Sequence, residues 1–223
     1  MSGSSNDNPL HWGSYPMAPW AGRITHGQFD LDGTSHQLPI VLDNHAIHGT
    51  VYLLPWQVDR HDHLSATLLC DLGPEWPLGG SARQVFTLNH HELVCELSVT
   101  AADQAMPCSI GWHPWFVKPE SDQLLFHKMY ERMPNNIPSG KLVAPKARPW
   151  DDCFVEPAAP LQLHYPLVTV SVSSACDHWI VYDEPTHAIC VEPQTGPANQ
   201  FNSNPYMLQP GETLTRSMLI SWR

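Results

Sequence analysis

Apolar and polar residues alternate along much of the chain with a period of two. In LVCELSV, residues 93–99, every odd position is apolar, and Glu96 and Ser98 lie between them. In LVTVSVSS, residues 167–174, valines at alternate positions are separated by Thr or Ser. This alternation is typical of strands that bury one face. Further short β-type runs are found at residues 65–72, 179–184, 188–193 and 217–222.

The connections between these runs also favour an all-β fold. Residues 83–88 (RQVFTL) and the polar NHHE that follows them predict a hairpin with 93–99. The 22 prolines interrupt any long helical pattern. One stretch, residues 122–133, predicts either a short helix or another strand, and we expect 137–152 to be a loop inside the domain. The spacing of the runs is typical of a β-sandwich.

Length and composition indicate a single folded domain. The chain has 223 residues, of which 42% are hydrophobic, so it can bury a substantial core. Gly, Ser, Asn and Pro are prominent in the first two dozen residues, a composition typical of a loosely held segment. We therefore expect an N-terminal arm over residues 1–22 and one β-sandwich domain over residues 23–223.

Charge and hydropathy exclude two classes of partner. The formal net charge is −11 and there is no basic run, so the chain lacks the cations that bind a nucleic-acid backbone. No 18 apolar residues run together, and the first residues have neither the basic nor the apolar region of a signal peptide. We expect a cytoplasmic protein that binds neither nucleic acid nor membrane.

The cysteines and histidines raise the question of a metal site. The six cysteines lie far apart, without a C-x-x-C pair, which is typical of buried thiols in a reducing compartment. His61 and His63 would face the same way on a strand, as in a metal-binding cupin, but no glutamate follows at the distance a cupin needs. Exposed histidines at a strand edge are the better interpretation of this pair.

Four short motifs contain candidate catalytic or binding residues. His113 lies among aromatic residues in GWHPWF, His48 precedes a glycine in NHAIHG, Asp151 and Asp152 are adjacent in WDDCF, and Glu192 ends an apolar run in CVEPQTG. No single motif is specific, because a histidine among aromatics is often a core residue and a strand-end glutamate is often a surface charge.

Taken together, the motifs resemble those of a known family. GRITHGQFDLDG, NHAIHG followed by Trp56, SIGWHPWF, IPSG, DDCF, CVEPQTGPANQFN and LQPGETL occur in the order found in the aldose 1-epimerases, over residues 16 to 222. The resemblance implies the galactose mutarotase-like β-supersandwich fold. Only 22 residues precede Arg23, so it also implies a shortened N-terminal region. We expect a partner subunit in a homo-oligomer, or the N-terminal arm, to cover the sheet edge left open.

The resemblance further implies a reaction and a role for each motif residue. The reaction is the interconversion of the α and β anomers of an aldohexose, with no cofactor and no metal. Ring opening needs a base at the C1 hydroxyl and an acid at the ring oxygen. By motif, His113 would be the general acid and Glu192 the general base. The residues that would bind the sugar are Arg23, His48, either Asp151 or Asp152 with Asp151 preferred by alignment, and the aromatic residues Trp56 and Trp115.

A carbohydrate-binding β-sandwich without catalysis is the alternative function. The presence of both His113 and Glu192 in their motifs favours the enzyme. The sequence leaves the aldose undetermined, but few cations other than Arg23 and Lys118 lie near the motifs, which disfavours a sugar phosphate.

Overall fold

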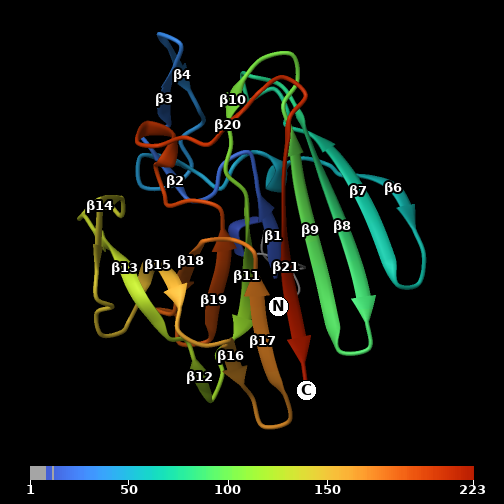
Figure 1. Ribbon diagram of the computed structural model, residues 1–223, viewed down its shortest axis with the longest axis vertical. Coiled ribbons are helices and arrows are strands. Elements are labelled where there is room, and N and C mark those ends of the chain that lie inside the picture. Colours follow the sequence, from blue (N-terminus) through green and yellow to red (C-terminus); the bar gives the residue numbers. More distant parts are fainter. Residues whose placement is uncertain (1–8, 12) are drawn as a thin grey trace.

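Two large antiparallel sheets form the body of the molecule (Figure 1). The computed structural model describes residues 9–11 and 13–223. The seven-stranded sheet contains, in spatial order, β1 (Ser14–Met17), β11 (Gly111–Val117), β19 (Ala188–Gln194), β18 (His178–Tyr182), β15 (Asp151–Pro157), β13 (Phe126–Arg132) and β14 (Pro138–Val143). The eight-stranded sheet contains β12 (Ser121–Gln123), β16 (Leu161–His164), β17 (Thr169–Ser174), β21 (Thr213–Trp222), β9 (Glu92–Thr100), β8 (Ser81–Asn89), β7 (Ser65–Asp71) and β6 (Gln57–His61).

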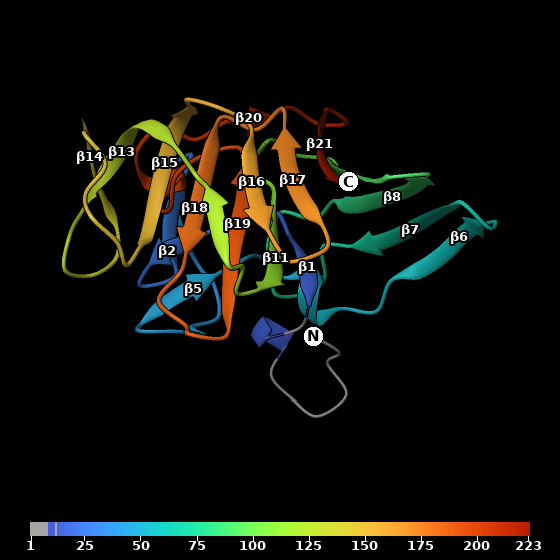
Figure 2. The ribbon, with the colours of Figure 1, turned by 90° about the horizontal axis from the view of Figure 1, so that it is seen from below.

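Smaller elements lie around the two sheets. Three two-stranded sheets among the described residues pair β10 (Met106–Pro107) with β20 (Met207–Leu208), β2 (Arg23–Thr25) with β5 (His45–Ile47), and β3 (Gln28–Leu31) with β4 (Thr34–Gln37). The helical residues of this part of the chain form single 3₁₀ turns, η2 (Pro9–His11), η3 (Val51–Leu53) and η4 (Gln200–Asn202). Figures 1 and 2 show β6 and β7 at one end of the molecule and β13 and β14 at the other.

The core lies between the two large sheets, where their apolar faces meet. Trp112 and Val181 of the seven-stranded sheet share one buried cluster with Leu97, Leu163 and Met218 of the eight-stranded sheet. Successive side chains of a strand point to opposite faces, so the neighbours of these residues in the seven-stranded sheet point away from the core. This second face carries the polar groups described below.

The strands predicted from the period of two are confirmed. Residues 93–99 lie in β9, which pairs with β8 as the predicted hairpin, and Cys95, Leu97 and Val99 are buried. Of the two alternatives for 122–133, the structure has strands, β12 and β13. The loop expected over 137–152 is wrong in part, because it contains β14, an edge strand whose proline, glycine and lysine gave no strand signal.

The N-terminal part of the chain is more closely packed than the composition suggests. Residues 14–17 form β1, which pairs with β11, and Tyr15, Met17 and Trp20 are buried. Residues 14–17 therefore form part of the seven-stranded sheet, although the prolines and glycines near them indicate coil. The domain boundary at residue 23 stays a prediction. Residues 1–8 and 12 lie outside the described residues, so an arm over them stays a prediction.

Several other expectations concern the surface and the thiols. All six cysteines are buried and none forms a disulfide. His61, at the end of β6, and His63 are exposed, as expected of histidines at a strand edge.

The edge strand β6 is exposed throughout. It includes Asp59 and Arg60, and charged residues on an edge strand discourage pairing with another chain. The homo-oligomer stays a prediction. Among the described residues, no helix is long and apolar enough to span a membrane.

Candidate active site

A cavity of about 450 Å³ lies on the face of the seven-stranded sheet that points away from the core. Side chains that are neighbours across the strands line it in a row. The register places Tyr15 opposite His113, Glu192 opposite Ile180, and Ile180 opposite Cys153. All five line the cavity, and Arg23 of β2 and Ile47 of β5 contribute to its lining as well. The strands of the large sheet therefore form the floor of the site, and the short strands β2 and β5 with the loops next to them complete its lining.

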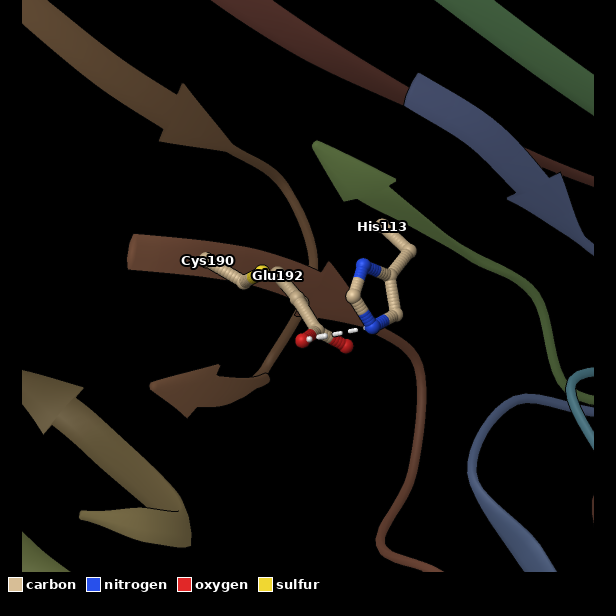
Figure 3. A group of neighbouring side chains, drawn as sticks. All are labelled: His113, Cys190 and Glu192. Atoms are coloured by element: carbon tan, nitrogen blue, oxygen red, sulfur yellow. Dashed lines mark ion pairs between the residues drawn. The ribbon is translucent and has the colours of Figure 1, made fainter. Parts of the chain in front are cut away.

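His113 and Glu192 meet in the middle of this row. The pairing of β11 with β19 sets Gly111 opposite Gln194 and Trp115 opposite Cys190, so His113 and Glu192 lie opposite each other. Nε2 of His113 is 3.2 Å from Oε1 of Glu192, and the two side chains are only 9% and 2% exposed (Figure 3). An imidazole nitrogen and a carboxylate oxygen at this distance can form a hydrogen bond, and both kinds of side chain can act as a general acid or base.

Gly111 allows β11 and β19 to approach each other closely. A Cβ at this position would lie 2.7 Å from both the Cβ of Gln194 and the carbonyl oxygen of Pro193. We expect Gly111→Ala to push the strands apart and to lower the free energy of unfolding by about 1–3 kcal/mol, as overpacking does in other cores. Urea unfolding measures this loss. An unchanged free energy of unfolding would contradict the close approach.

His48 enters the cavity from a strained turn after β5. Its φ is 63° and that of Gly49 is 80°, both in the left-handed region that favours glycine. Its backbone N–H donates to the carbonyl of Gly22 at 3.0 Å. The His48 ring contacts the His113 ring edge to face, with centroids 5.1 Å apart. Strain of this kind is common at functional sites, where the surrounding structure holds a side chain in place.

Arg23, in β2, is held by the GPANQFN motif. The Asn199 backbone N–H donates to the carbonyl of Arg23 at 2.6 Å, and the Asn199 side chain accepts from the N–H of Thr25 at 3.0 Å. These two bonds connect β2 to the loop after β19, which contains Glu192. Sequence reasoning included Asn199 only as part of a motif, and the structure shows its contact with Arg23.

The adjacent aspartates of β15 point to opposite faces of the sheet. Asp151 lines the cavity, whereas Asp152 is 1% exposed and lies 2.9 Å from Nζ of Lys146. Arg132 also lines the cavity and donates to Oδ2 of Asp151 at 3.1 Å. Sequence reasoning missed Arg132, because its stretch was open to both helix and strand, and missed Tyr15, which lies in the segment expected to be an arm.

The two tryptophans predicted to bind a sugar lie in different places. Trp115 lines the cavity and stacks on His113, with ring centroids 5.3 Å apart. Trp56 is packed against the core and donates from Nε1 to the carbonyl of Val51 at 3.0 Å. The structure does not bring Trp56 to the cavity.

Burial and neighbouring charges shift the acidity of the cavity groups. Burial raises the pKa of Glu192 well above its usual value, Asp151 adds to the rise, and Arg23 opposes it. Burial lowers the pKa of His48 well below its usual value, and His113 and Arg23 lower it further. Burial and the charge of Glu192 raise the pKa of Tyr15. Tyr15 therefore stays protonated and His48 neutral, while Glu192 is a stronger base than an exposed carboxylate.

Several buried polar atoms of the cavity residues have no hydrogen-bond partner in the described part of the chain. They are the hydroxyl of Tyr15, Nε of Arg23 and Nδ1 of His48. Buried polar groups without partners are rare in proteins, and several around one cavity indicate a polar ligand. Aromatic side chains and unpartnered polar groups together suit a ligand with apolar faces and a hydroxylated rim.

Two residues of the cavity floor, His113 and Glu192, and the buried Cys190 beside them also have the composition of a metal site. His113, Cys190 and Glu192 offer ligand atoms that all lie within 4.8 Å of one another. Nitrogen, sulfur and carboxylate oxygen are ligands of zinc. The group includes both members of the acid and base pair.

Comparison with known proteins identifies the fold of this site. A candidate aldose 1-epimerase of Escherichia coli K12 matches with a TM-score of 0.84 and 20% identity, over 96% of this chain and 85% of that one. The galactose 1-epimerase of Lactobacillus acidophilus NCFM matches with a TM-score of 0.80 and 17% identity, over 99% and 82% of the two chains. The fold is therefore the galactose mutarotase-like β-sandwich expected from the sequence.

Sequence comparison identifies the family. The uncharacterized protein YphB of Escherichia coli K12 is 30% identical over 105 residues, which are 46% of this chain and only 36% of that relative's length. The family model of the aldose 1-epimerases matches residues 4–164, well over half of the chain. The protein belongs to the aldose 1-epimerase family.

Proposed function

We propose that the protein is an aldose 1-epimerase that interconverts the α and β anomers of an uncharged monosaccharide. The observation that carries the proposal is the buried pair of His113 and Glu192, 3.2 Å apart on the floor of a cavity of about 450 Å³. Cavities of this size are typical of small-molecule sites. The family match supports the same reaction.

The arrangement suits acid and base catalysis of ring opening. Glu192 takes the proton of the C1 hydroxyl while protonated His113 gives a proton to the ring oxygen, and the bond between C1 and the ring oxygen breaks to leave an aldehyde. The hydroxyl and ring oxygens share one carbon, C1, so the acid and base that reach them must themselves be neighbours. Rotation about the C1–C2 bond exposes the other aldehyde face, and the same pair closes the ring in reverse.

The remaining cavity residues would hold the sugar. The unpartnered atoms of Arg23 and His48 offer hydrogen bonds to hydroxyl groups, and the Asp151 carboxylate accepts them. The indole of Trp115 offers an apolar surface to the C–H face of the ring. Because Glu192 and His113 project from adjacent strands, the sheet fixes their relative position before the sugar binds.

Polarimetry tests the proposal. Freshly dissolved α-D-glucose and α-D-galactose relax slowly in buffer, and the protein is expected to accelerate the relaxation of at least one of them in proportion to its concentration. A folded protein that binds the sugar without accelerating its relaxation would instead support a carbohydrate-binding sandwich.

A phosphorylated sugar is expected to be a poor substrate. Arg23 and Arg132 are the arginine or lysine side chains that line the cavity in the described part of the chain, and Arg132 is paired with Asp151. Four carboxyl groups line it as well: Asp43, Asp151, Glu184 and Glu192. The excess of acidic groups repels a phosphate, so kcat/KM for glucose 6-phosphate should be at least about tenfold below that for glucose, a difference of about 1.4 kcal/mol. Polarimetry of the two sugars at equal concentration measures the ratio, and equal values would contradict this prediction.

A further inference from the structure

Cys190 has no part in the proposed acid and base chemistry, although it lies beside the pair that performs it. It is fully buried, two residues before Glu192 on β19, so both side chains point to the same face of the sheet. Figure 3 shows Cys190 and Glu192 projecting from one strand and His113 reaching toward them from the next. The Cys190 Sγ, a nitrogen of His113 and a carboxylate oxygen of Glu192 all lie within 4.8 Å of one another.

We propose that His113, Cys190 and Glu192 bind a thiophilic divalent cation such as Zn²⁺, and that the bound ion inhibits the enzyme. The inhibition rests on the proposed function, whereas the binding of the ion does not. These three residues are the trio of the proposed metal site.

The geometry of the trio is close to that of a zinc site. Zinc binds sulfur at about 2.3 Å and nitrogen or oxygen at about 2.0–2.2 Å, so tetrahedral ligands lie about 3.3–3.8 Å apart. The nitrogen of His113 and the oxygen of Glu192 are already 3.2 Å apart. The sulfur has to move by about an ångström at most to complete the set, because no ligand pair exceeds 4.8 Å. Three protein ligands leave a fourth position open on the cavity side, where His113 and Glu192 lie.

The bound ion would inhibit by occupying the atoms that move protons. Nε2 of His113 and the carboxylate of Glu192 would donate their lone pairs to the ion, so neither could exchange a proton with a sugar. Binding releases the thiol proton of Cys190 and any proton shared by the other two groups, because metal ligands must be deprotonated. No oxidation or reduction takes place.

The ligand types predict which ions bind. A thiolate and an imidazole favour Zn²⁺, Co²⁺ and Cd²⁺, whereas Mg²⁺ and Ca²⁺ prefer sites made only of oxygen. Zn²⁺ is therefore expected to inhibit at concentrations at which Mg²⁺ has no effect.

Cobalt absorption tests the site without any measurement of activity. Co²⁺ added to chelator-treated protein is expected to give the near-ultraviolet charge-transfer absorption of a cobalt–thiolate bond. Cys190→Ser should abolish this absorption, and Cys190→Ala serves if the serine variant does not fold. Cys108→Ser is the matched control, because Cys108 is as fully buried as Cys190 but lies outside the trio and does not line the cavity, and it should keep the absorption.

Zinc titration then tests the inhibition. The affinity of Cys190→Ser for Zn²⁺ should fall by more than about 100-fold, since losing even an outer partner of a metal ligand costs 10- to 100-fold. Zn²⁺ should inhibit mutarotation by the wild type and by Cys108→Ser, but not by Cys190→Ser at the same concentration. Absence of a cobalt–thiolate absorption in the wild type would overturn the site. Cobalt absorption without any mutarotase activity would instead contradict the proposed function and leave the metal site standing.

Discussion

Replacement of Glu192 by glutamine is expected to lower kcat for mutarotation by about 10²- to 10⁴-fold, the usual contribution of a general base. Glutamine keeps the size and hydrogen-bonding reach of the side chain but cannot accept the proton of the C1 hydroxyl. Glu192 is 2% exposed and lies 3.2 Å from His113 on the cavity floor, where a carboxylate can reach the C1 hydroxyl of a bound sugar. Initial rates of polarimetric relaxation over a range of sugar concentrations measure kcat and KM separately.

The stability of this variant separates a catalytic role from a structural one. Burial raises the pKa of Glu192 above its unfolded value of about 4.3, so the folded state disfavours the ionised carboxylate. The resulting loss in the free energy of unfolding grows as the pH rises from the unfolded pKa toward the folded pKa. Glu192→Gln has no charge to bury and is expected to be no less stable than the wild type at neutral pH. Glu156→Gln, on an exposed position of β15, is the control and should keep full activity. Wild-type rates in folded Glu192→Gln would exclude Glu192 as the base.

Replacement of His113 by asparagine should give a loss of similar size. Asparagine is polar and can form a hydrogen bond, but it cannot deliver a proton to the ring oxygen, so kcat should fall by about 10²- to 10⁴-fold. The double variant His113→Asn/Glu192→Gln should be only slightly slower than either single variant, because the two residues act on one step. The same polarimetric rates measure all three variants.

A second histidine provides the control for this substitution. His178→Asn removes a half-buried imidazole from β18, where it stacks on Tyr130 outside the acid and base pair. It should retain mutarotation close to that of the wild type. Equal losses in His113→Asn and His178→Asn would show a general effect on the fold and count against a specific role of His113.

The period of two in the sequence predicts both the strands and the face on which the site lies. In GWHPWF, neighbouring side chains must point to opposite faces, and the structure has Trp112 in the core and His113 in the cavity. The same alternation separates Asp151 from Asp152 on β15. Local rules suffice here because a strand has only two faces.

Contacts between strands distant in sequence could not be predicted from the pattern. The row that joins Tyr15, His113 and Glu192 depends on the order β1, β11, β19 in one sheet, and nothing local specifies that order or its register. Arg132 lies in the cavity for the same reason, through the pairing of β13 with β15. Trp56 follows the NHAIHG motif in sequence, yet its indole N–H donates a hydrogen bond to the carbonyl of Val51 and its ring packs on the core.

The most direct test of the proposed ring opening follows the two anomers at equilibrium by NMR exchange spectroscopy in D₂O, with galactose and glucose labelled with ¹³C at C1. Ring opening by His113 and Glu192 predicts exchange between the α and β signals that the wild type accelerates and His113→Asn/Glu192→Gln does not. No deuterium should be incorporated at C1 or C2, because ring opening breaks no C–H bond. Folded wild-type protein that leaves exchange at the buffer rate, or that incorporates deuterium at C2, would contradict it.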